Sequence, residues 1–312
     1  MLPSISKYLQ EKIHNFPKED YLLLNNHKIK LNPDNFNSLN PTSNSKTIAF
    51  IDGGEAQILS AGNFCLSLIR VAAIIFQNNK KINAEQYEFY LLTTAVPKND
   101  EIYYESKIFS EKPLIDENDL FISSTDETIR SGLERASLTK ISNMARRFAE
   151  LTLASKITSD YILLDGTLQP TFNNEEKYLD KIKNKASALA KTNTLFTQSG
   201  NNPVILLSKS SPSGCWSYLA EEQTYFVKLH EKSNYIFRFE GNPEIMPLLL
   251  ANSNDALFLG YPYGLILADK LARVSNQEKS NLAANFLLRA ENREIRDYLY
   301  SGNTHEILDR LG

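Results

Sequence analysis

Two short apolar runs in this chain end in the same dipeptide, Asp-Gly. The first run contains Asp52 and the second contains Asp165. Each run is typical of a buried strand, and the glycine that follows the carboxylate lets a ligand approach the backbone. A single Asp-Gly pair is equally a turn, in which aspartate caps and glycine permits a positive φ. Because the ends of neighbouring parallel strands lie about 4.8 Å apart, two such pairs predict a shared site for a divalent cation and phosphate.

Composition places few limits on function. The chain has 312 residues, of which 42% are hydrophobic and 23% charged, and its net charge of −3 neither requires nor excludes a nucleic-acid partner. Cys65 and Cys215 form no Cys-x-x-Cys pattern, so we expect neither a disulfide framework nor a zinc site. The longest apolar stretch, 66–76, is interrupted by Arg70, and residues 1–16 have no apolar signal-peptide core. These features predict a cytoplasmic protein without membrane segments.

The order of the predicted elements indicates an α/β fold. Three early strands are followed by helix-linked strands, which is the order of an RNase H-like mixed β-sheet flanked by helices, with added helical and β-hairpin elements. We expect an N-terminal helix and linker over 1–46, a nuclease-like domain over 47–275 and a C-terminal helical extension over 276–312. The predicted elements are strands at 47–52, 57–76, 88–96, 160–165 and 203–208, a hairpin of 225–230 with 235–240, helices at 127–155, 175–191 and 263–274, and an irregular surface excursion at 97–126.

Further carboxylates are needed if two metal ions are to hydrolyse a phosphodiester. The long predicted helix before Asp165 offers Glu150 or Glu134. The late helix offers Asp269, which shares a face with apolar residues at helical spacing. The alternative for either glutamate is a solvated helix face or an ion pair with Arg146 or Arg147. The alternative for Asp269 is an ion pair with a lysine or arginine.

Several motifs in order resemble the NurA family of DNA-repair nucleases. They span about residues 47–275 and comprise Ile51-Asp52-Gly53, Arg146-Arg147-Phe148-Ala149-Glu150, Leu163-Leu164-Asp165-Gly166-Thr167-Leu168, Tyr225-Phe226-Val227-Lys228-Leu229-His230, Phe237-Arg238-Phe239, Gly260-Tyr261-Pro262-Tyr263 and Ala268-Asp269-Lys270-Leu271-Ala272.

The resemblance implies an RNase H-like core, a homodimer, Mn²⁺-dependent cleavage of DNA and a hexameric HerA-type ATPase as partner in end resection. It carries the metal-binding and catalytic carboxylates over to Asp52, Glu150 and Asp165. The family often has histidine where this chain has Asp269, and a small hydroxyl residue where it has Gly54. Aspartate is an oxygen ligand, so we keep Asp269 as a fourth metal ligand, with Mn²⁺ or Mg²⁺ as the cation.

DNA contacts require Lys, Arg or aromatic side chains that face the groove. The candidates are Lys209 beside a Gly/Ser loop and, on the predicted hairpin, Tyr225, Lys228, His230 and Arg238. The alternative for the aromatic hairpin is core packing, and a one-residue shift of its register would move Arg238 to the other face.

We therefore predict a metal-dependent deoxyribonuclease, a single-stranded endo- and 5′–3′ exonuclease that acts in double-strand-break end resection through metal-activated water. Two other functions stay open: a non-catalytic DNA-processing subunit on the same fold, and a phosphotransferase of the actin-like or sugar-kinase type. The chain has no Walker A motif, so we do not expect it to be the motor itself.

Overall fold

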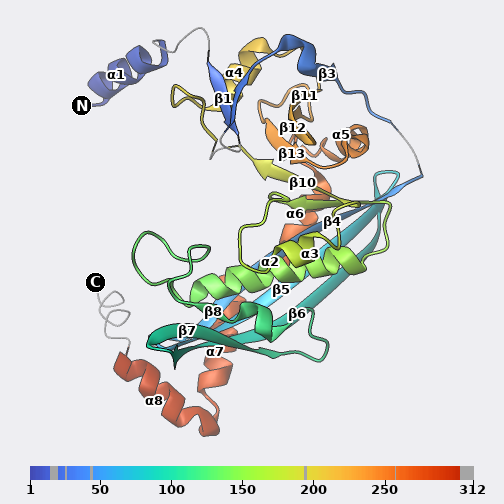
Figure 1. The fold of residues 1–312 in the computed structure, drawn as a ribbon. Coiled ribbons are helices and arrows are strands. Elements are labelled where there is room, and N and C mark those ends of the chain that lie inside the picture. Colours follow the sequence, from blue (N-terminus) through green and yellow to red (C-terminus); the bar gives the residue numbers. More distant parts are fainter. Residues whose placement is uncertain (15–19, 25–26, 43–44, 193–194, 257, 303–312) are drawn as a thin grey trace. The chain divides into compact units, whose positions relative to one another are not determined.

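The computed structural model describes residues 1–14, 20–24, 27–42, 45–192, 195–256 and 258–302 (Figure 1). The chain divides into two compact units. The first consists of 1–44, 165–168 and 187–263, and the second of 45–164, 169–186 and 264–312. Over the described part of the chain, no helix combines the length and the apolar character needed to cross a membrane.

The second unit contains the predicted meander. Its strands lie in the order β9-β4-β5-β6-β7-β8, with β4 antiparallel to β5, β5 to β6 and β6 to β7. Strand β9 runs parallel to β4, which makes the sheet mixed. The strands are β4 (Thr47–Ala61), β5 (Phe64–Gln77), β6 (Lys80–Lys98), β7 (Glu101–Phe109), β8 (Ile122–Ser123) and β9 (Tyr161–Asp165).

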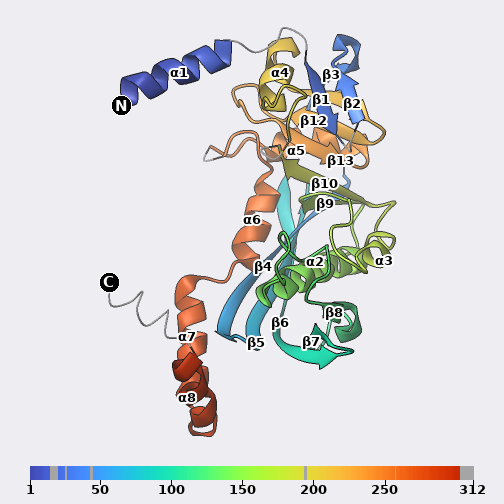
Figure 2. The same cartoon turned by 60° about the vertical axis from the view of Figure 1, so that its left-hand side comes forward.

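Helices lie on both faces of this sheet (Figure 2). Helix α2 packs on β4 and β5, and its apolar stripe is fully buried, as the spacing of Ile141, Met144, Ala145, Phe148 and Leu151 predicts. Helices α6 and α7 lie on the opposite face. The helices of the unit are α2 (Thr139–Lys156), α3 (Glu176–Leu179), α6 (Tyr263–Ala272), α7 (Asn276–Leu287) and α8 (Arg293–Gly302), with short 3-10 turns η2 (Glu117–Leu120) and η4 (Ala290–Asn292).

The first unit has its own core under a second set of strands, in the order β3-β11-β12-β13-β10. Leu22, Leu207, Trp216, Tyr218 and Phe226 are buried together in this core. A separate hairpin pairs β1 (Tyr21–Leu24) with β2 (His27–Lys30). The other elements are α1 (Leu2–His14), η1 (Pro33–Asn35), β3 (Phe36–Ser38), β10 (Ala186–Lys191), α4 (Pro203–Ser210), β11 (Trp216–Glu221), β12 (Thr224–Lys228), β13 (Phe237–Glu240), η3 (Pro243–Ile245) and α5 (Met246–Asn252).

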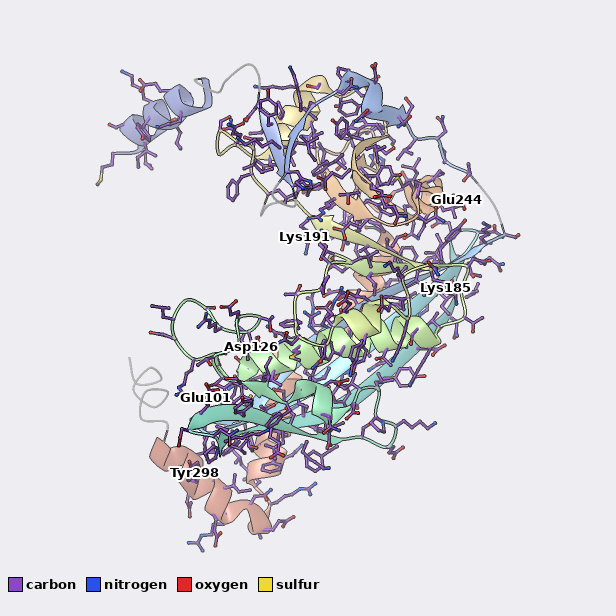
Figure 3. The ribbon with its side chains drawn as sticks, in the orientation of Figure 1. Glu101, Asp126, Lys185, Lys191, Glu244 and Tyr298 are labelled. Atoms are coloured by element: carbon purple, nitrogen blue, oxygen red, sulfur yellow. The ribbon has the colours of Figure 1, made fainter. Side chains whose placement is uncertain are left out.

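Several predicted elements are wrong. The helix predicted over 175–191 is only α3, and its C-terminal part is strand β10. Residues 188–191 pair with β13, so the ladder overrides the helix preference of an alanine-rich segment. Lys185, inside the predicted helix, lies in the turn before β10 and is exposed (Figure 3).

Three further predicted segments differ from the structure. The strand predicted at 203–208 is helix α4, because Asn202 accepts a hydrogen bond from Val204 N at the helix start and Pro203 suits the first turn. The excursion predicted at 97–126 contains β7 and β8. The helix predicted from 127 begins at Thr139, after a turn in which Gly132 has a φ of 68°.

Candidate active site

Asp52 lies inside strand β4, not at its end as predicted, because β4 continues to Ala61. What ends here is the pairing with β9, which runs from Ile48–Tyr161 to Ile51–Leu164. Asp52 is the next residue after the last paired one, and its Oδ1 accepts a hydrogen bond of 2.7 Å from Gly53 N. Asp52 therefore lies where two parallel strands separate, and not where a strand ends.

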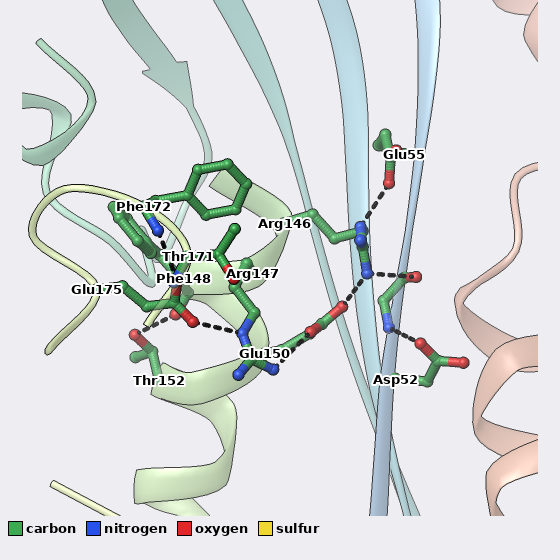
Figure 4. A network of polar contacts seen from close by, with 11 residues as sticks. Asp52, Glu55, Arg146, Arg147, Phe148, Glu150, Thr152, Thr171, Phe172 and Glu175 are labelled. Carbon is green, nitrogen blue, oxygen red and sulfur yellow. Dashed lines mark hydrogen bonds and ion pairs between the residues drawn. The ribbon is translucent and has the colours of Figure 1, made fainter. Parts of the chain in front are cut away.

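The two glycines after Asp52 face opposite sides of the sheet. A Cβ on Gly53 would lie 2.5 Å from Glu150 Oε1, whereas a Cβ on Gly54 would lie 2.5 Å from the Ala272 carbonyl oxygen. Side chains alternate along a strand, so Asp52 points toward the α6 face and Glu150 approaches from the α2 face (Figure 4). At Gly53 and Gly54 the strand has no side chains, which lets α2 approach it on one face and the end of α6 on the other.

Glu150 is the buried carboxylate of the site, with 3% of its surface exposed. It forms an ion pair with Arg146 and a second with Arg147, whose Nη1 lies 3.7 Å from Glu150 Oε2. The ion pair that the sequence left as an alternative is thus present. Glu134 precedes the helix and is exposed, so it does not compete for this position.

Asp269 is on α6, with a half-exposed side chain that pairs with Arg273 at 2.5 Å. The helix packs closely along β4, because a Cβ on Gly264 would overlap the ring of Phe50, just as Gly54 meets Ala272 at the other end. Residue 264 thus lies against residue 50 and residue 272 against residue 54. Midway between these contacts, Asp52 faces the helix near residue 268, one residue from Asp269.

Asp165 is the last residue of β9, and the loop that follows it is held by two backbone donors. Gly166, with a φ of 103°, donates to the Leu189 carbonyl at 3.1 Å. Leu168 N donates to Glu240 Oε2 at 2.7 Å. The second Asp-Gly pair thus does include a positive-φ turn, which is the local role that the sequence offered as an alternative.

Among the described residues, no three His, Cys, Asp or Glu side chains stand close enough to hold a metal ion together. The structure brings Glu150 to the strand of Asp52, on the opposite face, and places Asp269 on the helix that covers the Asp52 face. The four predicted carboxylates therefore do not form one compact cluster here.

Three predicted DNA-binding residues keep some exposure. Lys209 is exposed in the last turn of α4, not at a strand end. Lys228 ends β12 and is partly exposed. His230 follows it, and its Nδ1 accepts a hydrogen bond from Lys232 N at 3.1 Å, which fixes the ring orientation.

The other two predicted DNA-binding residues are partly or fully packed inside the first unit. Tyr225 makes an edge contact with Phe239 across β12 and β13. Arg238 is 7% exposed and its Nη2 lies 2.6 Å from Glu240 Oε1, the carboxylate that also holds the loop after Asp165. The register places Arg238 opposite Phe226.

The sequence does not indicate the carboxylates that pair with the two arginines beside Glu150. Arg147 Nε donates to Glu175 Oε1 at 2.8 Å, and Arg146 Nε lies 2.6 Å from Glu55 Oε2. The spacing of the two arginines from Glu150, three and four residues, was the available signal for the helix pairs. Nothing in the sequence pattern indicates Glu55 or Glu175 as partners, because both come from other segments.

Comparison with known proteins identifies the class of fold. No family model matches the sequence, and no curated protein matches it. Among solved structures, the NurA nuclease from Sulfolobus solfataricus matches with a TM-score of 0.50 and 14% identity, over 94% of this chain and 93% of that one. The chain therefore has the α/β fold of these NurA structures, a large mixed sheet flanked by helices, as the sequence predicts.

A second NurA crystal structure agrees with this result, at a TM-score of 0.50 and 11% identity, over 94% of this chain and 98% of that one. An endonuclease V from Ciona intestinalis, in complex with DNA containing inosine, matches at a TM-score of 0.40 and 11% identity, over 76% of this chain and 90% of that one. The resemblance to NurA that the motifs predict is thus confirmed in the fold over nearly the whole chain.

Proposed function

We propose that this chain is a divalent-metal-dependent DNA nuclease. The observation that carries the proposal is the position of Asp52, one residue past the last pair between β4 and β9, with the buried Glu150 carboxylate reaching the same strand at Gly53. The NurA-like fold over 94% of the chain supports it. Asp165 joins the proposal because it directly follows Leu164, the partner of Ile51.

The donors suit a hard dication such as Mn²⁺ or Mg²⁺. Carboxylate and backbone oxygens are the ligands that these ions take, and the absent side chain of Gly53 leaves room that the Glu150 carboxylate occupies. Asp52, Glu150, Asp165 and Asp269 are the ligands we propose, and they would have to come together when the cation binds, because no three such side chains of the described residues stand close enough to hold it. When bound, it would lower the pKa of a water and neutralise charge on the phosphate that the water attacks.

The remaining steps belong to the chain's own side chains. The hydrogen bond from Gly53 N orients the Asp52 carboxylate, and Arg146 and Arg147 are both ion-paired to Glu150. Lys209, Lys228 and His230 offer partly or fully exposed groups for phosphate contact. The substrate we propose is single-stranded DNA and DNA ends, cut endonucleolytically and in the 5′–3′ direction.

The cellular setting follows from the motifs that resemble NurA. We propose that the chain acts as a homodimer in double-strand-break end resection, together with a hexameric HerA-type ATPase. Co-purification of the two chains, and stimulation of resection by ATP only when both are present, would test this part. A nuclease that resects ends fully without the ATPase would contradict it.

The nuclease itself is tested with purified protein on linear single- and double-stranded DNA, in Mn²⁺ and in Mg²⁺. We expect cleavage with Mn²⁺ and its loss in Asp165→Ala, while Asp180→Ala, an exposed aspartate elsewhere in the chain, cuts normally. Full activity in Asp165→Ala would remove that residue from the site. No cleavage and no binding of Mn²⁺ would favour the non-catalytic subunit.

A further inference from the structure

A row of aromatic side chains lies on one face of strand β13 and becomes more exposed toward its N-terminal end. Side chains alternate along a strand, so Phe237 and Phe239 share one face and Arg238 lies on the other. The ring of Tyr235 contacts the ring of Phe237, with centroids 6.3 Å apart. Phe239 is fully buried and Phe237 is 7% exposed, whereas Tyr235 is 61% exposed. The row therefore runs from the interior of the first unit out to solvent.

A second tyrosine, from a distant segment, joins the exposed end of this row. The ring of Tyr261 contacts that of Phe237, with centroids 5.4 Å apart and planes at 57°. The backbone before Tyr261 lies close to the turn that precedes β13, because a Cβ on Gly260 would lie 2.6 Å from Ser233 Oγ. Tyr235, Phe237 and Tyr261 thus form one cluster of rings, which we call the aromatic platform.

The turn that carries Tyr235 is fixed by hydrogen bonds among its own residues. Tyr235 N donates to Ser233 Oγ at 3.0 Å, and Ser233 N donates to the His230 carbonyl at 3.2 Å. Lys232 N donates to His230 Nδ1 at 3.1 Å. The exposed ring is therefore attached to an ordered backbone, so little further ordering of the chain is needed when a ligand binds it.

Positive charge lies beside the aromatic platform. Lys191, the last residue of β10, is the Cα partner of Phe237, so the two side chains are on the same face of the sheet (Figure 3). Lys191 and Lys232 are both exposed. Glu231 is next to Lys232 in the same turn and offsets its charge, so Lys191 is the cation we assign to the platform. A ring with an exposed lysine beside it suits a nucleotide, whose base stacks and whose phosphate takes the charge.

We propose that Tyr235, supported by Phe237 and Tyr261, is a base-stacking platform for a single strand of DNA, with Lys191 contacting the phosphate beside the stacked base. The inference rests on the proposed function in taking DNA as the substrate, and it adds a strand-binding surface on the first unit. A single strand is the partner that fits, because its bases have free faces, whereas the bases of a duplex are stacked on one another. Every base has such a face, so the platform holds a strand without regard to its sequence.

Binding of a short fluorescein-labelled oligothymidylate tests the proposal, measured by anisotropy in EDTA so that the strand stays intact. We expect Tyr235→Ala to weaken binding about tenfold, the size of one lost base stack. Tyr235→Phe keeps the ring and should bind as wild type does, whereas Tyr235→Leu should bind as weakly as Tyr235→Ala. The matched control is Tyr298→Ala, which removes a 50% exposed tyrosine from α8 in the second unit and should leave binding unchanged (Figure 3).

A strand without bases separates stacking from the other contacts of Tyr235. An oligonucleotide of abasic sites keeps the phosphates but has no base to stack, so Tyr235→Ala and wild type should bind it equally. Blunt duplex DNA should also bind the two proteins equally. An equal loss of affinity for the abasic and the normal strand in Tyr235→Ala would overturn the stacking role.

The salt dependence of binding tests Lys191. Lys191→Gln should lower the slope of log affinity against log salt concentration by about 0.7, the value for one phosphate contact on a single strand. The matched control is Lys185→Gln, an exposed lysine of the second unit, which should leave the slope unchanged (Figure 3). If Lys191→Gln has the slope of wild type, Lys191 contacts no phosphate and that part of the proposal is overturned.

The outcomes separate this inference from the proposed function. If wild type binds the single strand and cuts it in Mn²⁺, but Tyr235→Ala binds it as tightly, the platform is overturned and the nuclease stands. If Tyr235→Ala shows the tenfold loss but wild type never cuts the strand, the platform stands and the nuclease falls. If wild type does not bind single-stranded DNA, the platform falls.

Discussion

The Gly53→Ala substitution probes the closest approach between helix α2 and strand β4. The added Cβ would lie 2.5 Å from Glu150 Oε1, 2.8 Å from Arg146 Cγ and 3.1 Å from Glu150 Cγ. Real Cβ contacts are longer than this, so the Glu150 side chain must move. It is buried and paired with Arg146 and Arg147, so its movement disturbs both ion pairs.

The magnitude follows from two opposing effects. Overpacking of a buried site costs about 1–3 kcal/mol. Replacing glycine inside a strand stabilises the folded state by about 0.5–1 kcal/mol, because alanine lowers the conformational entropy of the unfolded chain. We therefore expect Gly53→Ala to lower the free energy of unfolding of the second unit by about 1–2 kcal/mol, which is about 2–8 °C in melting temperature for a unit of this size.

Urea unfolding followed by circular dichroism measures this change. The matched control is Gly62→Ala in the β4–β5 turn, where a Cβ would meet nothing within 4 Å, so its stability should equal or slightly exceed that of wild type. If Gly53→Ala is as stable as Gly62→Ala, Glu150 does not lie against the strand as described, and the reasoning about the site is refuted.

Three further predictions concern the frame around the site and the stability of the first unit. Gly264→Ala should lower stability by about 1–3 kcal/mol by overlap with Phe50, and thermal melting checks this. Glu175→Gln should cost about 3 kcal/mol, because Arg147 loses its buried partner, and urea unfolding would show a smaller loss if the pair were unimportant. Burial raises the pKa of the Asp20 carboxyl, but the hydrogen bonds it accepts outweigh burial and lower the pKa to about 2. Its stabilisation is therefore present above about pH 4 and lost as the pH falls toward 2, so Asp20→Asn should flatten the acid side of the stability profile, and an unchanged profile would contradict the shift.

The sequence predicts the parts of the fold that periodicity and strand order determine. The early meander, the apolar stripe of α2 and strand β9 all follow from local pattern. Strand β10 was missed because its residues favour a helix in isolation, and only the pairing with β13 makes them a strand. Helix α4 is read as a strand because an apolar run of that length fits either state, and only its Asn-Pro start indicates a helix.

The candidate site was predictable in its residue types and less so in its geometry. The Asp-Gly pattern led to Asp52, but pattern alone could not tell that β4 continues past it and that the pairing with β9 ends there. Spacing on the helix indicated the ion pairs of Glu150. The anchoring by Glu175 and Glu55 depends on contacts between distant segments, which no local pattern encodes.

Cleavage of a labelled linear single-stranded DNA in Mn²⁺, compared between wild type and Asp52→Asn, tests the central claim most directly. Asparagine keeps the size of the side chain and can still accept the hydrogen bond from Gly53 N, so the fold is expected to persist by circular dichroism. The account predicts that wild type cuts the strand and that Asp52→Asn leaves it intact. Equal cleavage by the two proteins would contradict the assignment of this carboxylate to the active site.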